Sequence, residues 1–267
     1  MSIFGFYILA YTYSWILWIL GIVFLKDILN PYLIVSIGGL APVISFLAYF
    51  IFEYNTKQKY EYLSRLIKFK KNSMLCWITA LIVPFLIIII SIIIDGIFFS
   101  TEFSISNIIK LDQEFINKGL VYPVFLLAFG PVPEEMAWRG IALNELIKKG
   151  YLKAQLIVAL LWALWHFPLF FIEGSYQAGL GLFTIEFWMF FINIFFISLI
   201  TGWIYLKSNK SILLAIIFHY IINLSGEMFY ITTTGEILVT IFTCLLGIVL
   251  FIQPILSKKS IDCSIKI

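Results

Sequence analysis

The chain has 267 residues, of which 62% are hydrophobic and 12% charged, whereas a soluble domain averages about 45 to 50% and about 25%. This composition excludes a water-soluble globular fold. The net charge of +3 is too small, and the Lys and Arg residues too scattered, for a nucleic-acid-binding surface. We therefore expect an all-α, polytopic bundle of transmembrane helices, with residues 1–267 forming one integral membrane domain and residues 119–226 its motif-bearing core.

Apolar segments taken in chain order predict about eight membrane spans, since each transmembrane helix needs about 20 apolar residues. They cover residues 3–25, 32–52, 75–99, 119–138, 154–172, 181–206, 211–226 and 235–256. The N-terminal sequence MSIFGFYILA lacks the basic region and the cleavage site of a secretory signal. We expect the first segment to be retained as a span.

Basic residues segregate to alternate loops, as the positive-inside rule requires of a multi-pass cell-membrane protein. One side carries Lys57, Lys59, Arg65, Lys68, Lys70, Lys71, Lys148, Lys149, Lys153, Lys207, Lys210, Lys258, Lys259 and Lys266. The opposite loops carry only Lys26, Lys110 and Lys118, among several acidic residues. This asymmetry predicts that both termini are cytoplasmic.

Two further features have plain interpretations. Cys76, Cys244 and Cys263 lie far apart without a CxxC spacing, so we interpret them as small apolar fillers rather than a redox pair or zinc site. The segment Tyr54 to Ser73 is basic and Tyr-rich with scattered apolar positions. It is equally consistent with a helix lying on an anionic membrane surface and with a solvated loop.

Ionisable residues at membrane depth are the positions that point to function. Each costs at least about 2.5 to 3.5 kcal/mol on insertion scales, so each requires a partner, a cavity or a role in chemistry. They are Glu134 and Glu135 with Arg139, His166, His219 with Asn223, and Asp95 and Glu186. The last two fall near predicted span ends, where a hydrated carboxylate is tolerated, and we interpret them as structural.

The segment AFGPVPEEMAWRG, residues 128–140, predicts a broken helix. Pro131 and Pro133 have no N–H to donate and clash with a preceding helical turn. A helix that restarts at Pro133 places Glu134 and Glu135 in its first turn, where unpaired N–H groups favour ionised carboxylates. A broken helix survives in a membrane only where protein or water satisfies the freed backbone groups. We therefore expect a polar cavity here.

The two adjacent glutamates differ in their expected partners. Glu135 and Arg139 are four residues apart in the order that favours an ion pair on one helix. Glu134 projects about 100° away around the helix and has no partner in its own segment. A general base must take up protons near neutral pH, and desolvation gives an unpaired carboxylate that property. Glu134 is therefore the candidate base.

The chain contains two histidines, and both lie in apolar segments. His166 follows Trp162 by one helical turn and precedes Pro168, which ends or kinks the helix. His219 shares a helical face with Asn223. Either histidine alone is more typical of a buried structural group, but together with the glutamate pair on a third span they predict one convergent polar site.

Three short motifs lie in a fixed order on successive predicted spans. They are EExxxR, an aromatic residue four positions before a histidine, and HxxxN, comprising Glu134, Glu135, Arg139, Trp162, His166, His219 and Asn223. In this order and spacing they resemble the CPBP family of intramembrane proteases. That family includes the type II CAAX prenyl endopeptidases, known as Rce1-like, and bacterial relatives linked to bacteriocin processing and self-immunity.

The resemblance implies a catalytic set of Glu134, His166, His219 and Asn223, with Glu135 and Arg139 in support, and a site that opens toward the cytoplasm. The family usually carries Phe at the position of Trp162. The predicted span boundaries place His166 nearer the outer membrane face than Glu134, and a tilted or kinked helix would bring the two level.

The reaction that these residues favour is hydrolysis of a peptide bond by water activated on Glu134. His219 and Asn223 form one donor pair for the oxyanion, and His166 either positions the water or protonates the leaving amine. The motifs contain no Ser or Cys, which disfavours a covalent acyl-enzyme. The expected partners are the lipid bilayer and a peptide or membrane-protein substrate.

Two alternatives stay open at this point. Glu134, His166 and His219 are a legitimate zinc ligand set, although no HExxH pair is present and we favour chemistry without a metal or other cofactor. A transporter, a channel or a bacteriocin-immunity protein would use the same buried residues for binding or proton relay, but repeated halves, which are typical of transporters, are not seen.

The substrate is not readable from the sequence. The Ile-, Lys- and Asn-rich composition is typical of a bacterial source, where prenylated CAAX proteins are generally absent. This favours peptide precursors or fragments of membrane segments as substrates.

Overall fold

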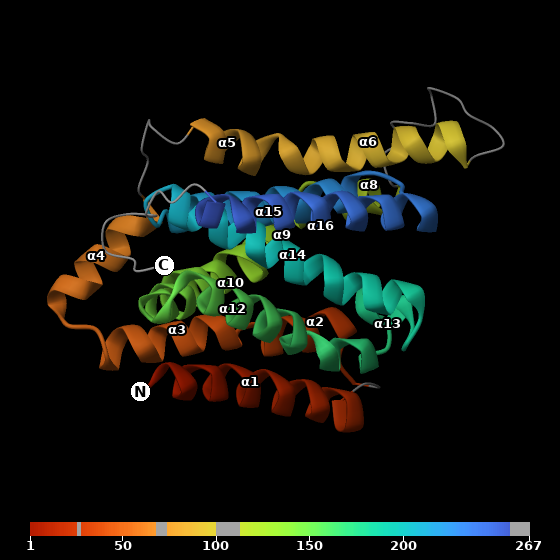
Figure 1. Ribbon diagram of the computed structural model, residues 1–267. Coiled ribbons are helices and arrows are strands. Elements are labelled where there is room, and N and C mark those ends of the chain that lie inside the picture. Colours follow the sequence, from red (N-terminus) through yellow and green to blue (C-terminus); the bar gives the residue numbers. More distant parts are fainter. Residues whose placement is uncertain (26–27, 68–73, 100–112, 257–267) are drawn as a thin grey trace.

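The structure is a computed structural model that describes residues 1–25, 28–67, 74–99 and 113–256 (Figure 1). These residues form a bundle of helices without a β-sheet, which confirms the predicted all-α class. The longest helices run roughly along one another, with α5 and α6 on one side of the bundle and α1 on the other (Figure 1).

Five helical segments of the described residues are long and apolar enough to cross a membrane. They are Ile3–Leu25, Pro31–Phe52, Tyr151–Phe171, Ile185–Lys207 and Thr233–Leu256. A sixth is the pair α5 (Met74–Leu81) and α6 (Val83–Phe98), which is bent by 45°. Pro84 in the first turn of α6 has no N–H to continue the preceding helix. Residues in six of the eight predicted spans therefore fold as expected.

The other two predicted spans differ, so the count of eight is not confirmed. The segment 211–226 becomes α15 (Ile212–Met228), a shorter apolar helix. The segment 119–138 is divided into α9 (Val121–Phe129) and α10 (Pro131–Ala137). The break confirms the helix interruption that the prolines predict, although the new helix begins at Pro131 rather than Pro133.

The remaining helices complete the path of the chain. The first span is α1 (Ile3–Leu20) with a π-helical turn (Gly21–Leu25), and the second comprises α2 (Pro31–Gly39) and α3 (Ala41–Phe52). The short helices are α4 (Thr56–Leu66), α8 (Gln113–Lys118), α11 (Asn144–Leu146) and α13 (Tyr176–Leu180). The long ones are α12 (Tyr151–Trp165), α14 (Ile185–Lys207) and α16 (Thr233–Leu256). Helix α14 packs on α12, α15 and α16, while α10 packs on α3 and α15.

Helix α4 is formed within the segment Tyr54 to Ser73, of which residues 68–73 lie outside the described part. It crosses one end of the bundle (Figure 1) and buries Tyr62 and Arg65 against it. The Tyr62 ring packs so closely on Gly140 that a Cβ there would lie 2.7 Å from the ring. Arg65 Nη1 donates to the Tyr205 hydroxyl at 2.6 Å. The described part of the segment is therefore a helix packed on the bundle rather than a solvated loop, and its position on an anionic membrane surface stays a prediction.

Candidate active site

Helix α10 carries both glutamates into the interior of the bundle. Gly130 precedes the helix with φ −116° and ψ −90°, and its carbonyl accepts from the backbone N–H of Glu134 at 3.1 Å. Glu134 is 8% exposed and Glu135 is fully buried. Beyond α10 the chain continues as a π-helix (Trp138–Leu143), an uncommon local structure that often occurs at functional sites.

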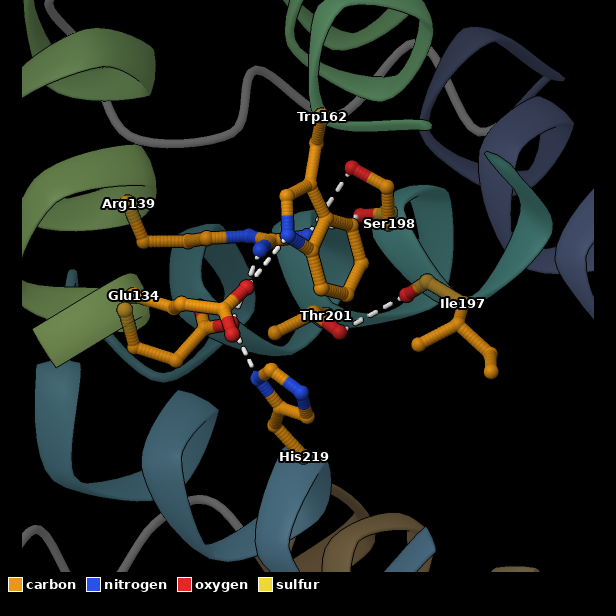
Figure 2. Close-up of polar contacts among 8 residues, drawn as sticks. Glu134, Arg139, Trp162, Ile197, Ser198, Thr201 and His219 are labelled. Atoms are coloured by element: carbon orange, nitrogen blue, oxygen red, sulfur yellow. Dashed lines mark hydrogen bonds and ion pairs between the residues drawn. The ribbon is translucent and has the colours of Figure 1, made fainter. Parts of the chain in front are cut away.

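Glu135 is the centre of a buried ionic network. Its Oε1 accepts from Arg139 Nη1 at 2.8 Å, as the sequence spacing predicts, and from His219 Nδ1 at 2.9 Å. Arg139 also donates from Nη2 to the backbone oxygen and the hydroxyl of Ser198, at 3.0 and 2.9 Å. Glu135 thus joins α10 to α15, and its partner Arg139 extends the network to Ser198 on α14 (Figure 2). A buried charge is tolerated when it is paired in this way.

Glu134 has a partner that the sequence reasoning missed. The indole N–H of Trp162, on α12, donates to Glu134 Oε2 at 2.5 Å. The same ring lies 4.7 Å from Arg139 Cζ, a cation–π arrangement, and 5.1 Å from the ring of His219. Figure 2 shows Trp162 directed at the glutamates from the side opposite His219. Glu134 therefore has no cation of its own, but it does have a hydrogen-bond donor.

His166 lies at the C-terminal end of α12, where Pro168 stops the helix. Its Nδ1 is 2.8 Å from the carbonyl oxygen of Trp162. Because a carbonyl only accepts, Nδ1 carries the proton, and Nε2 of the neutral ring is left as an acceptor. The ring is 8% exposed and lies 5.8 Å from the Trp162 ring, measured between centroids. In the described part of the chain, hydrogen bonds therefore link His166 to Glu134 only through Trp162, whose carbonyl accepts from His166 and whose indole N–H donates to Glu134.

His219 has the same arrangement with a different acceptor. Its Nδ1 faces the carboxylate of Glu135, which already accepts from Arg139. Nδ1 therefore donates, and Nε2 is the nitrogen available for other partners. Both histidines are held by Nδ1 and keep Nε2 unused by these contacts.

Asn223 is the one predicted site residue that the structure does not bring into this hydrogen-bonded set. It follows His219 by one turn on α15 and is half-buried. Within the described residues no hydrogen bond joins its amide to the glutamates or the histidines. Its shared helical face with His219 is as predicted.

Two supporting residues were absent from the sequence analysis. Ser198 is 1% exposed within a long apolar helix, and a lone hydroxyl in such a run was the available signal. Tyr62 donates from its hydroxyl to the Met136 carbonyl, next to the glutamates, at 2.8 Å. Burial raises the pKa of Tyr62 well above its usual range, so this phenol stays a donor. Nothing in the sequence of α4 reveals that contact.

The contacts of these side chains also bear on the zinc alternative. Among the described residues, no three His, Cys, Asp or Glu side chains are grouped so that they could hold a metal ion. The Nδ1 atoms of His166 and His219 are occupied by a carbonyl and a carboxylate, and Oε2 of Glu134 by an indole N–H. These contacts leave Nε2 of both histidines and Oε1 of Glu134 unused, and metal-bound histidines commonly bond their other ring nitrogen to a carbonyl or a carboxylate. The zinc ligand set of Glu134, His166 and His219 therefore stays an alternative prediction.

Comparison with known proteins bears directly on this site. Residues 116–225 match the family described as type II CAAX prenyl endopeptidase, Rce1-like. All the predicted site residues lie inside that range. The chain is also 31% identical to CAAX prenyl protease 2 of Methanococcus maripaludis, in an alignment that covers 95% of each chain.

The buried glutamates and histidines on separate helices thus belong to a peptide hydrolase, and the apolar helices make it a multi-pass membrane protein. The chain belongs to the Rce1-like family of type II CAAX prenyl endopeptidases. The resemblance that the three motifs suggested is confirmed.

Proposed function

We propose that the protein is an intramembrane endopeptidase in which Glu134 activates the attacking water. The observation that carries this proposal is the contrast within the glutamate pair. Glu135 is bonded to both Arg139 and His219, whereas Glu134 has no cation within hydrogen-bond distance among the described residues and is slightly exposed. It is the carboxylate free to accept a proton.

The histidines have complementary roles in this mechanism. The Nε2 lone pair of His166 orients the water beside Glu134, and after the attack Nε2 takes up the proton that Glu134 has accepted and passes it to the leaving amine. His219 is oriented by Glu135 and, when its ring is protonated, donates from Nε2 to the oxyanion. Asn223, one turn further on α15, supplies the second donor from its amide. Glu135 and Arg139 hold the arrangement in place.

The substrate and the setting belong to the same proposal. The archaeal relative is named a CAAX prenyl protease, so a prenylated peptide with a CAAX terminus is the first probe. Peptide precursors and membrane-segment fragments are the alternative substrates that the composition favours. We place both termini and the opening of the site on the cytoplasmic side of the cell membrane, and treat residues 1–267 as one domain. The predicted polar cavity beside Glu134 stays a prediction.

The test uses purified protein in lipid vesicles with an internally quenched, farnesylated CAAX peptide. Glu134→Gln keeps the size and the acceptor oxygen of the side chain but cannot take up the proton. We expect the cleavage rate to fall by about 10²- to 10⁴-fold, the range for loss of a general base. Comparing membrane proteomes of cells that carry either form would reveal native substrates. Unchanged cleavage by Glu134→Gln would refute the mechanism.

A non-enzymatic role is separated by the same variant. An immunity or transport protein that binds a ligand in this site would tolerate Glu134→Gln, because an amide still binds. Protection or transport in cells would then persist. If Glu134→Gln loses both the biological effect and the cleavage of the peptide, the result supports a protease.

A zinc-dependent mechanism is separated by metal analysis. We propose hydrolysis without a metal cofactor. The metal content of the purified protein is compared with that of Glu134→Ala and His166→Ala. Stoichiometric zinc in the parent protein that both variants lose would replace the proposed mechanism with a metalloprotease.

A further inference from the structure

Trp162 stands at the point where the family usually carries Phe, and it contacts four residues of the candidate site. It is 2% exposed. Its ring contacts the Arg139 guanidinium and the rings of both histidines. A Phe could make these ring contacts. The hydrogen bond from the indole N–H to Glu134 Oε2, at 2.5 Å, is the one interaction that a Phe could not make.

That bond makes the two oxygens of Glu134 inequivalent. An indole N–H is a donor only, so Oε2 must accept from it. Within the described residues no hydrogen bond reaches Oε1. Oε1 lies near Gly130, the residue at the break between α9 and α10. A Cβ atom added to Gly130 would be 4.0 Å from Oε1. The indole thus fixes the carboxylate with one oxygen occupied and the other directed at the interrupted backbone.

We propose that Trp162 is a positioning residue that selects Oε1 of Glu134 as the atom that takes the water's proton. This inference rests on the proposed role of Glu134. In the step, one O–H bond of the water breaks, its proton moves to Oε1, and the water oxygen bonds to the substrate carbonyl carbon. The proton later leaves with the amine, so that one water is consumed. Trp162 exchanges no proton and keeps Oε2 in place throughout.

The first test is Trp162→Phe, assayed with the farnesylated CAAX peptide. It retains an aromatic ring over Arg139 and removes the donor. We expect kcat to fall by about 10- to 100-fold, the effect of a misplaced catalytic group, while KM changes less than about 2-fold because substrate binding is not involved. The matched control is Trp203→Phe. Trp203, on α14, is also buried (1% exposed), and its N–H donates to Gln253 on α16 at 3.0 Å. The kcat of Trp203→Phe should therefore change less than about 2-fold.

A second variant separates the donor from the ring volume. Replacing Trp162 with 3-benzothienylalanine keeps the shape of the indole but substitutes sulfur for the N–H. We expect the same loss of kcat as in Trp162→Phe, and this variant carries the test if Trp162→Phe does not fold. Full kcat with the benzothienyl side chain overturns the inference and assigns the tryptophan a packing role.

Different experimental outcomes would refute the role of Trp162 and the proposed function. If Glu134→Gln cleaves the peptide normally, the general-base mechanism is wrong and Trp162 has nothing to position. If Glu134→Gln is inactive while both Trp162 variants work at the parent rate, the mechanism stands and only the role of Trp162 is refuted.

Discussion

Carboxylates occur both at the centre of the bundle and at the end opposite α4, but the two regions hold them in different ways. At the far end Asp95 accepts from the Thr232 hydroxyl at 2.7 Å, and Glu227 pairs with Lys118 at 3.0 Å. These side chains are partly exposed near helix ends, where we expect water to share in their solvation. At the centre, Glu135 is fully buried and is bonded to Arg139 and to His219 on α15.

This difference teaches that a carboxylate in an apolar sequence is informative only through its neighbours. A single hydroxyl with nearby water is sufficient at a helix end. In the interior, a charge needs a cation and further donors with fixed geometry. Glu135 has such surroundings, Glu134 has the indole N–H of Trp162 in their place, and Asp95 does not need them. The predictions below test that contrast through stability and activity.

The largest effect on stability is expected for Glu135→Leu. It leaves the Arg139 guanidinium buried without its carboxylate, and breaking a buried pair in this way costs about 3 to 5 kcal/mol. The free energy of unfolding is measured by denaturant titration in detergent micelles. The double variant Glu135→Leu with Arg139→Met should recover much of the loss, because it removes both charges. A single variant as stable as the parent would show that the ion pair does not hold the centre together.

Much of the fold was predictable because its signals are local. Composition and apolar length predict membrane helices, and the prolines around Gly130 predict the break between α9 and α10. The number of spans was harder to predict, because α15 and the two helices formed by residues 119–138 are shorter than a membrane-spanning helix. The docking of α4 depends on Tyr62 fitting over Gly140, a contact between distant parts of the chain that no local pattern contains.

The candidate site was predictable to the same degree. The Glu135–Arg139 pair follows from an i, i+4 spacing within one helix, and the structure contains it. The bond from His219 to Glu135 and the bond from Trp162 to Glu134 join separate helices. Their existence depends on how α10, α12 and α15 pack, which spacing does not specify. The roles of Glu134, His166, His219 and Asn223 in catalysis stay predictions.

A smaller effect is expected for Tyr62→Phe, which removes the hydroxyl that bonds to the Met136 carbonyl. The loss of one such hydrogen bond costs about 0.5 to 1.5 kcal/mol of unfolding free energy. Tyr60→Phe is the matched control on the same helix. Tyr60 is 74% exposed, so its change should stay within about 0.5 kcal/mol. Equal stabilities of the two variants would mean that α4 does not support the glutamate-bearing helix through this contact.

The smallest effect is expected for Asp95→Asn, at the far end of the bundle. The remaining carbonyl oxygen of the amide can still accept from Thr232, and the partly exposed side chain loses a charge that water already screens. We expect unfolding free energy within about 0.5 kcal/mol of the parent and cleavage of the farnesylated CAAX peptide within about 2-fold. Glu134→Gln makes the same chemical change, one oxygen to one NH₂, yet is expected to slow the reaction by about 10²- to 10⁴-fold. A tenfold loss of cleavage in Asp95→Asn would mean that the two regions act together, and the contrast between them would have to be given up.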